Sequence, residues 1–187
     1  YGKTLFNQSL LNDKINNMDE IQGKINTIEP ALQNPEIQIR EFNELSPYQV
    51  ARLYALRYNV FVREQKSIYD EHDGKDFQAK HLFVEEGDGI IAYARICREQ
   101  EGIVSIGRIV VDQRYRKQKL GEKIVGSAIE QTRLMPGVKK INIGAQLYLQ
   151  KFYEGFGFVA TSEPYDDEGV MHINMSRDLQ KQGLTGL

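Results

Sequence analysis

The chain has 187 residues, which is room for one compact domain with an appendage. Its 24 Lys and Arg residues against 26 Asp and Glu residues give a formal net charge of −2, without the strong basic excess of a dedicated nucleic-acid-binding protein. The single cysteine, Cys97, excludes an internal disulfide, and no segment has the roughly 20 apolar residues that a membrane span requires. We therefore expect a soluble, cytoplasmic protein that binds neither nucleic acid nor a membrane.

The first 35 residues differ from the rest of the chain and predict a helical appendage. Apolar side chains recur there at steps of three and four residues, as on one face of an amphipathic helix, namely Leu11, Ile15, Met18, Ile21, Ile25 and Ile28. This face either packs on the chain's own domain or forms an oligomer contact, such as that of a homodimer. We expect one domain over 36–179 and a short tail over 180–187.

The predicted domain begins with a strand and a capped helix. Apolar and polar residues alternate over Glu36–Phe42, which predicts a strand. Ser46 as N-cap and Pro47 at the first helical position then indicate the start of a helix. This helix should end near Glu64, before a polar, acidic loop over Ser67–Lys80. Its expected buried face includes Leu53, Leu56 and Val60.

The remaining elements alternate in a way that is typical of a mixed sheet. Three strands joined by glycine-containing turns predict an antiparallel meander, with ranges His81–Glu86, Ile90–Arg98 and Ile103–Val111. A basic loop, Asp112–Lys119, leads into a helix over Leu120–Leu134. The last predicted elements are a strand, a short helix and two strands, with ranges Lys139–Ala145, Leu147–Glu154, Phe158–Ser162 and Val170–Ser176. We therefore expect an α/β domain.

The basic loop is the first segment that indicates chemistry. Four cations stand directly before the start of the predicted helix, namely Arg114, Arg116, Lys117 and Lys119. Free backbone N–H groups and the helix dipole favour an anion at such a terminus, and Gly121 allows close approach of the backbone. The loop therefore predicts a pyrophosphate site, with a solvated basic turn as the alternative. It has neither the P-loop pattern nor the dinucleotide pattern G-x-G-x-x-G.

A second candidate segment follows the next strand. Gln146 stands at the strand end, where ligands of α/β sheets commonly bind. Phe152 and Tyr153 lie on the short helix behind it. Either both are core aromatic residues, or the Tyr153 hydroxyl serves as a proton donor at the strand–helix junction.

Together these residues resemble the GNAT superfamily of acetyl-CoA-dependent N-acetyltransferases. The family's cofactor loop reads Q/R-x-x-G-x-G/A, and Arg116 and Gly121 match its ends, whereas Lys119 replaces its middle glycine. The C-terminal family motif is matched by the residues Phe152, Tyr153, Glu154, Gly157 and Phe158. The chain is similar in particular to the ElaA-like branch, through the segments 56–65, 93–96, 106–109, 144–146 and 169–173.

The resemblance implies a GNAT-like acyl-CoA N-acyltransferase fold, with a central, mostly antiparallel mixed sheet flanked by helices. It implies that acetyl-CoA is the co-substrate and that an acetyl group moves to a primary amine by direct attack in a ternary complex. The pantetheine arm would pair with Ile109, Val110 and Val111, with the backbone N–H of Val111 donating to the thioester oxygen. The other implied cofactor residues are Arg116, Lys117, Gln118, Lys119, Leu120, Gly121, Gln146 and Phe152.

The candidate catalytic and acceptor residues come partly from this resemblance and partly from positions on the predicted strands. Tyr153 matches the family's proton donor. His172 is the candidate base, although we favour a hydrogen-bonded structural histidine. Glu64, Tyr69 and Arg108 are the candidate acceptor residues. Arg108, inside a strand, either holds an acidic substrate or pairs with a carboxylate such as Glu64; we favour the pair.

The acceptor itself, a small-molecule amine or a peptide amine, is left open by the sequence, and so are two other functions. One is a non-catalytic CoA-binding sensor or scaffold, and the other is an acyltransferase like the homoserine-lactone synthases. We expect no metal, because the EF-hand-like segment Tyr69–Lys80 lacks ligands at both ends.

Overall fold

The computed structural model of the chain describes residues 35–66 and 71–180. The predicted appendage before Pro35, the candidate acceptor residue Tyr69 and the tail beyond Gln180 therefore lie outside the described residues. Within the described ranges no helix is both long and apolar enough to cross a membrane.

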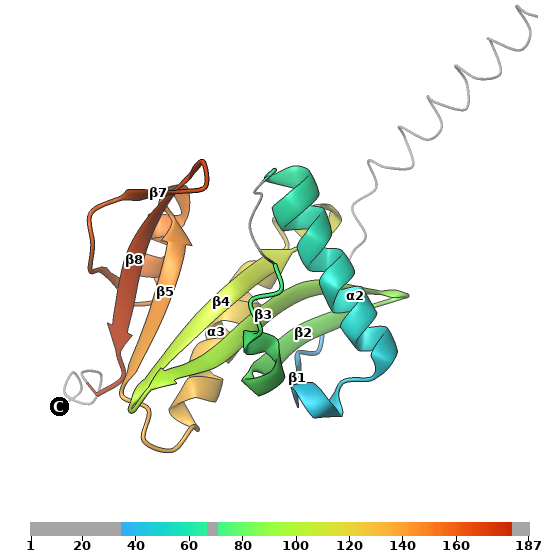
Figure 1. Cartoon of the computed structure of the whole chain (residues 1–187), viewed down its shortest axis with the longest axis horizontal. Helices are drawn as coiled ribbons and strands as arrows, with labels where there is room; N and C mark the ends of the chain where they lie inside the picture. The colour runs from blue at the N-terminus through green and yellow to red at the C-terminus, as the bar shows by residue number, and fades with distance from the viewer. Residues whose placement is uncertain (1–34, 67–70, 181–187) are drawn as a thin grey trace, which may run out of the picture. The chain divides into compact units, whose positions relative to one another are not determined.

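The domain is built on one eight-stranded sheet, whose strands follow the order β1-β2-β3-β4-β5-β8-β6, with β7 also paired to β8 (Figure 1). All of the pairs are antiparallel except β4 with β5, so the sheet is mixed and mostly antiparallel, as predicted. The strands are β1 Gln38–Glu41, β2 Lys80–Glu86, β3 Gly89–Gln100, β4 Ile103–Val111, β5 Lys140–Gln146, β6 Val159–Ala160, β7 Tyr165–Asp167 and β8 Val170–Asp178.

Helices cover both faces of this sheet, α2 on one and α3 on the other (Figure 1). The alternation of side chains along the strands divides them between two cores, so Leu82 packs with α3 whereas Phe83 packs with α2. The α-helices are α2 Pro47–Arg57, α3 Leu120–Arg133 and α4 Gln150–Glu154. Short 3-10 segments are η1 Phe42–Glu44, η3 Lys75–Gln78, η4 Gln113–Tyr115 and η5 Leu147–Leu149.

The start of α2 confirms the predicted N-cap at Ser46 and forms a capping box with Gln49. The Ser46 hydroxyl accepts from the Gln49 N–H at 3.2 Å, and the Gln49 side chain accepts from the Ser46 N–H at 3.0 Å. These two bonds satisfy backbone donors that the first turn of a helix leaves free. Leu53, Leu56 and Val60 are buried, as the spacing predicts.

The second half of this helix differs from the prediction. Beyond Arg57 the chain continues as a π-helix over Tyr58–Glu64, labelled η2, in which Gln65 N–H donates to the Val60 carbonyl at 3.0 Å. An i→i−5 bond widens the turn and changes the direction in which side chains leave the helix, and such segments are frequent at functional sites. Periodicity does not reveal this change, because the apolar spacing continues through it.

Two further expectations need correction. The predicted helix Leu147–Glu154 is divided into η5 and α4. The sequence analysis also missed β7, which has only three residues and is a strand because it pairs with β8. The acidic segment before β2 was expected to be a polar loop. It contains η3, and its Asp76 is buried against two arginines.

The sheet opens between β4 and β5. These strands pair only from Ile103 with Lys140 to Ser105 with Asn142, and they then diverge, as Figure 1 shows. A β-bulge follows directly in β4, where Arg108 and Ile109 lie opposite the single residue Ala94. Arg108 has a φ of +53°, a left-handed conformation inside a strand. The divergence leaves one edge of β4 open over residues 106–111 among the described strands.

Candidate functional site

A cleft of about 980 Å³ lies where β4 and β5 diverge. The π-helix, β4, the loop into α3, the end of β5, α4 and the β7–β8 hairpin contribute to its walls. The predicted site residues that line it are Glu64, Arg108, Ile109, Val110, Val111, Arg116, Lys117, Lys119, Leu120, Gly121, Gln146, Phe152, Tyr153 and His172. Gln118, between two lining lysines, does not itself line the cleft.

The open edge of β4 presents backbone groups to this cleft. The Asp112 N–H donates to the Ile91 carbonyl at 2.8 Å, toward β3. Because the backbone groups of a strand alternate between its two edges, those of Ile109 and Val111 face the opposite, open edge. Arg116 supports this orientation, since its Nε donates to the Val111 carbonyl at 3.1 Å. The Val111 N–H therefore faces the side on which the sequence analysis expected a ligand.

The four cations of the loop before α3 have different environments. Arg114 is bound to Asp112, with Nη2 to Oδ2 at 2.9 Å, and it does not line the cleft. Arg116 donates from its two terminal nitrogens to the Glu64 carboxylate at 2.6 and 2.7 Å. Lys117 and Lys119 line the cleft, and within residues 35–66 and 71–180 neither forms an ion pair. The positive charge offered to a ligand here is therefore that of two lysines.

Lys119 adopts a left-handed backbone conformation. Its φ is +58°, in the left-handed region that glycine occupies without strain, and it is the N-cap residue of α3. Gly121 lies in the first turn of α3. The protein itself leaves room for a methyl group there, because the nearest atom to an added Cβ would be Val111 Cγ2 at 3.9 Å. The lysine at this position therefore takes a backbone conformation that favours glycine, and it does so directly before the first turn of α3.

Tyr153 is buried at the back of the cleft. Only 5 % of its surface is exposed, and its hydroxyl has no hydrogen-bond partner within the described parts of the chain. Burial raises the pKa of Tyr153, so its hydroxyl is protonated at neutral pH. The ring packs edge-on against Phe152 and Phe158. Tyr153 is therefore a core aromatic residue that also lines the cleft.

His172 lies across from Gln146, with which it pairs between β8 and β5. Its Nδ1 is 2.8 Å from the Val170 carbonyl, which requires a proton on Nδ1 and leaves Nε2 of the neutral ring as the acceptor. Tyr165 of β7 stacks on the ring, with centroids 6.2 Å apart. Both interpretations of the sequence analysis are compatible with this geometry, since one ring nitrogen is hydrogen bonded to the backbone while the imidazole lines the cleft.

The acceptor residues are arranged differently from the expectation. Glu64 binds Arg116 and so connects the π-helix to the loop before α3. Arg108 does contact carboxylates, but these are Glu71, with 3.2 Å between Nε and Oε2, and Asp73, with 3.4 Å between Nη2 and Oδ2. The favoured pairing of Arg108 with a carboxylate is therefore confirmed, but the partners are Glu71 and Asp73 in place of the example Glu64, because the sequence does not show that the acidic segment folds back over β4.

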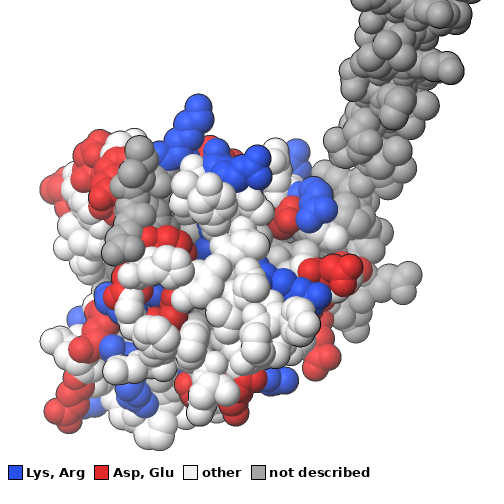
Figure 2. Space-filling model, turned by 45° about the vertical axis from the view of Figure 1, so that its right-hand side comes forward, with Lys and Arg blue, Asp and Glu red and all other residues white. Residues whose placement is uncertain are grey.

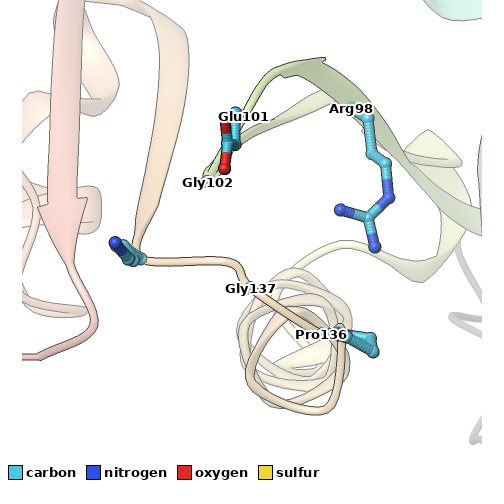
Figure 3. A pocket seen from close by; sticks show the side chains of 6 residues that line it. Arg98, Glu101, Gly102, Pro136 and Gly137 are labelled. Atoms are coloured by element: carbon cyan, nitrogen blue, oxygen red, sulfur yellow. The ribbon is translucent and has the colours of Figure 1, made fainter.

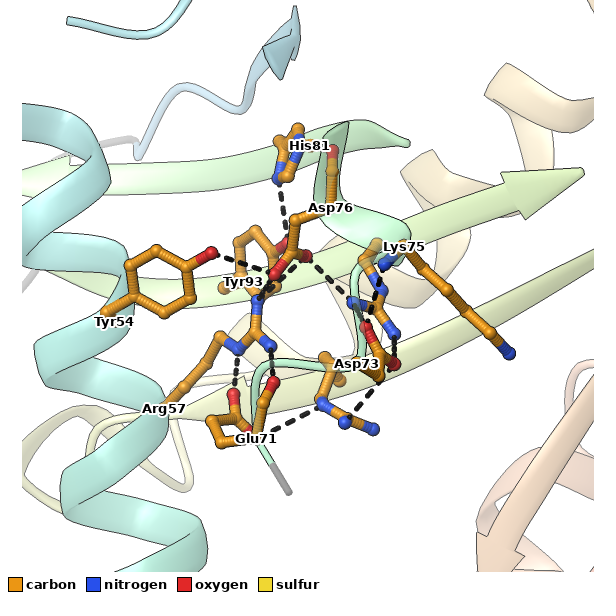
Figure 4. A network of polar contacts seen from close by, with 10 residues as sticks. Tyr54, Arg57, Glu71, Asp73, Lys75, Asp76, His81 and Tyr93 are labelled. Atoms are coloured by element: carbon orange, nitrogen blue, oxygen red, sulfur yellow. Dashed lines mark hydrogen bonds and ion pairs between the residues drawn. The ribbon is translucent and has the colours of Figure 1, made fainter. Parts of the chain in front are cut away.

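A larger network around Arg108 was missed by the sequence analysis. Figure 4 shows that it joins α2, the segment before η3, and strands β2, β3 and β4. Arg57 and Arg95, both buried, bind the same Asp76 Oδ1 at 2.9 and 2.8 Å. His81, also buried, contacts the Tyr93 hydroxyl and the Asp76 carbonyl. The signal in the sequence was the acidic run 70–76 itself, which was considered only as a metal loop.

A second hollow of about 500 Å³ lies at the other end of β4, between the β3–β4 turn and the loop that precedes β5 (Figure 3). Its lining residues are Arg98, Glu101, Gly102, Pro136, Gly137 and Lys139. It contains none of the predicted site residues. On the face displayed in Figure 2, basic and acidic side chains are interspersed, and they do not form one broad basic surface.

Three features together define an acyltransferase-like fold and site. The mixed sheet opens between β4 and β5, the bulged strand β4 leaves one backbone edge unpaired there, and the start of α3 lies beside this edge. The chain belongs to the GNAT acetyltransferase family, since residues 46–179 match the family described as "Acetyltransferase (GNAT) domain". Among curated proteins it is similar to protein ElaA of Escherichia coli, with 35 % identity over 77 % of this chain and 97 % of that protein.

Solved structures agree with this membership. The crystal structure of Escherichia coli ElaA has a TM-score of 0.72 and 36 % identity, covering 76 % of this chain and 99 % of its own. An acyl-CoA N-acyltransferase from Pseudomonas aeruginosa has a TM-score of 0.72 and 32 % identity at the same coverage. A GNAT acetyltransferase from Elizabethkingia anophelis with acetyl-CoA bound, at 17 % identity and a TM-score of 0.57, shares the fold over 79 % of this chain and 100 % of its own.

Proposed function

We propose that the protein is an N-acetyltransferase that transfers the acetyl group of acetyl-CoA to a primary amine, with both substrates bound at once. The single observation that supports this most is the open edge of β4, whose Val111 N–H faces a cleft that Lys117, Lys119 and Tyr153 also line. A backbone edge, cations at a helix start and a buried phenol suit the pantetheine, the phosphates and the sulfur of one molecule.

The residues of this chain have distinct parts in the proposed reaction. When bound, acetyl-CoA supplies a thioester carbonyl that the neutral amine attacks. Ile109 and Val111 hold the pantetheine arm through their backbone groups, and the Val111 N–H donates to the carbonyl oxygen. Lys117, Lys119 and the N–H groups at the start of α3 hold the phosphates.

Two side chains carry the protons. His172 Nε2 accepts the proton that the amine loses as the C–N bond forms, and Tyr153 gives its hydroxyl proton to the sulfur as the C–S bond breaks. The raised pKa of Tyr153 keeps this proton in place at neutral pH. The products are the amide and free CoA, and solvent then returns both side chains to their starting states.

The proposed acceptor is a small-molecule amine or a peptide amine. Asp167 and Glu168 of the β7–β8 hairpin line the cleft beside His172, and the nearest approach of Asp167 to that ring is 3.9 Å. Carboxylates at this position favour the approach of an amine that is cationic in water and becomes neutral only beside the base.

Calorimetry and a turnover assay with Tyr153→Phe test this proposal together. We expect the wild type to bind acetyl-CoA and to acetylate at least one amine of a panel of polyamines, aminoglycosides and lysine peptides. Tyr153→Phe keeps the ring and its packing, so acetyl-CoA affinity should stay within about twofold while kcat falls by about 100-fold.

Three results would contradict the proposal at different points. No heat of binding with acetyl-CoA or CoA would remove the acyltransferase activity altogether. Binding without acetylation of any amine would support the non-catalytic CoA sensor instead. Full turnover by Tyr153→Phe would remove Tyr153 from the proton transfer and leave the rest in place.

A further inference from the structure

The buried ion-pair network beside the cleft takes no part in the proposed proton transfers, although it reaches the strand on which acetyl-CoA would lie. It consists of three guanidinium groups and three carboxylates, those of Arg57, Arg95, Arg108, Glu71, Asp73 and Asp76. Figure 4 shows the side chains of Arg57 on α2, of Glu71 and Asp73 before η3, and of Asp76 on η3 converging. Arg95 of β3 and Arg108 of β4 complete the network.

The contacts run in one continuous chain toward the cleft. Arg57 binds both oxygens of Asp76, at 2.9 and 3.0 Å, and also contacts Glu71. Arg95 bridges Asp76 and Asp73, with 2.8 Å from its Nη1 to one oxygen of each. Asp73 and Glu71 then hold Arg108, whose side chain is 20 % exposed at the cleft wall.

The charges of this network balance one another. Each carboxylate contacts at least one guanidinium, and Arg95 holds the pKa of Asp73 well below its usual range in spite of burial. Guanidinium groups and carboxylates that already neutralise one another can hold the segments that carry them in place. A charged substrate could bind to one of them only by displacing its partner. This argues for a positioning function over a second substrate site.

The network ends at Arg108, whose backbone conformation is unusual. A non-glycine residue with a φ of +53° is strained, and such conformations persist only where the surroundings hold them. Here the residue is the bulge of β4, after which the strand leaves β5 and presents Ile109 and Val111 to the cleft. If the bulge relaxed to an ordinary strand, the alternation of the following residues would reverse.

We propose that Arg108 is a positioning residue for acetyl-CoA. Glu71 and Asp73 hold its guanidinium and thereby maintain the left-handed backbone that turns the Ile109 and Val111 edge toward the cleft. The inference rests on the proposed function for its ligand. Its claim about the backbone also applies to the ligand-free protein.

Two substitutions at this one position separate the backbone from the charge. Arg108→Ala removes the ion pairs and keeps the strain, so the bulge should relax and acetyl-CoA affinity should fall by about tenfold in calorimetry. Arg108→Gly removes the same ion pairs but adopts a positive φ freely, so affinity should stay within about threefold of the wild type. Arg108→Asn, which also tolerates this region, replaces the glycine variant if that fails to fold.

The matched control is Arg40, an exposed arginine of β1 without a positive φ. Arg40→Ala and Arg40→Gly should leave acetyl-CoA affinity unchanged, and glycine should be the less stable of the two in thermal unfolding. Equal losses of affinity in Arg108→Ala and Arg108→Gly, or no loss in either, would overturn the positioning function.

A ligand-free measurement separates this inference from the proposed function. The NMR amide shifts of Ile109, Val110 and Val111 should match the wild type in Arg108→Gly and change in Arg108→Ala. If the wild type binds no acetyl-CoA, the proposed function fails, and these shifts alone decide whether Arg108 holds the bulge. Shifts that change equally in both variants would overturn it.

Discussion

At the scale of single residues, the site includes two non-glycine residues in a backbone conformation that normally favours glycine. Lys119 and Arg108 both occupy the left-handed region, with φ of +58° and +53°. For Lys119 the consequence is that a cation stands where the family pattern has a glycine, in a backbone conformation that glycine adopts without strain. This lysine either adds a charge beside a bound phosphate or narrows the approach to the helix start, and substitution by glycine distinguishes the two.

We expect Lys119→Gly to weaken acetyl-CoA binding by about threefold, because an exposed charge beside a phosphate contributes less than about 1 kcal/mol. The stability of the fold should not fall, since glycine takes this backbone conformation without strain. Calorimetry at low and high salt measures the effect, which should shrink as salt rises. Arg114→Ala, in the same loop but bound to Asp112, is the control, and tighter binding by Lys119→Gly would show that the side chain narrows the approach.

At the scale of elements, helix stability and ligand binding favour different residues in the first turn of α3. A helix gains stability from alanine in place of glycine, by up to about 1 kcal/mol. Gly121 lies in this turn and lines the cleft, although the chain itself leaves room for a Cβ. The glycine is therefore explained by what approaches the helix start and not by the packing of the folded chain.

Gly121→Ala should accordingly raise the free energy of unfolding by about 0.5 kcal/mol while it lowers acetyl-CoA affinity by about tenfold. Urea denaturation and calorimetry measure the two effects. Gly126→Ala, in the same helix and with nothing near its added Cβ, should show the stabilisation alone. Unchanged affinity in Gly121→Ala would place the phosphates elsewhere.

At the scale of the whole molecule, the buried polar network connects the stability of the domain to pH. Burial lowers the pKa of His81, which is fully buried between Tyr93 and Asp76. Burial opposes ionisation of Asp73 and Asp76 as well, but Arg95 and, at Asp76, Arg57 outweigh it, so both carboxyl pKa values are lowered. In each case the unfolded chain takes up a proton at a higher pH than the folded chain does.

We therefore expect the free energy of unfolding to fall in two stages as the solution is acidified. The first begins near the unfolded pKa of histidine, about 6.5, and the second near that of aspartate, about 4, each proton adding at most about 1.4 kcal/mol per pH unit. Urea denaturation from pH 7.5 to pH 3.5 measures this. His81→Gln should flatten the first stage, and a first stage of the same slope in that variant would exclude His81 as its cause.

The sequence by itself determined most of the helices and strands and most of the residues that line the cleft. The cap at Ser46, the meander up to Val111 and the basic loop before α3 are local features, set by side chains that are near one another along the chain. The resemblance to the GNAT family, carried by motif residues that include Gly121 and Tyr153, predicted that these two residues belong to one site, and both line the cleft.

Only the tertiary structure decided how the charges pair. Arg108 meets Glu71 and Asp73 across more than 30 residues of chain, and Arg116 meets Glu64 across 52. It also decided the left-handed backbone at Arg108 and the strand β7, because a bulge and a three-residue strand exist only through their partners. Contacts between distant segments carry no periodic signal along the chain, so residue type alone could not identify them.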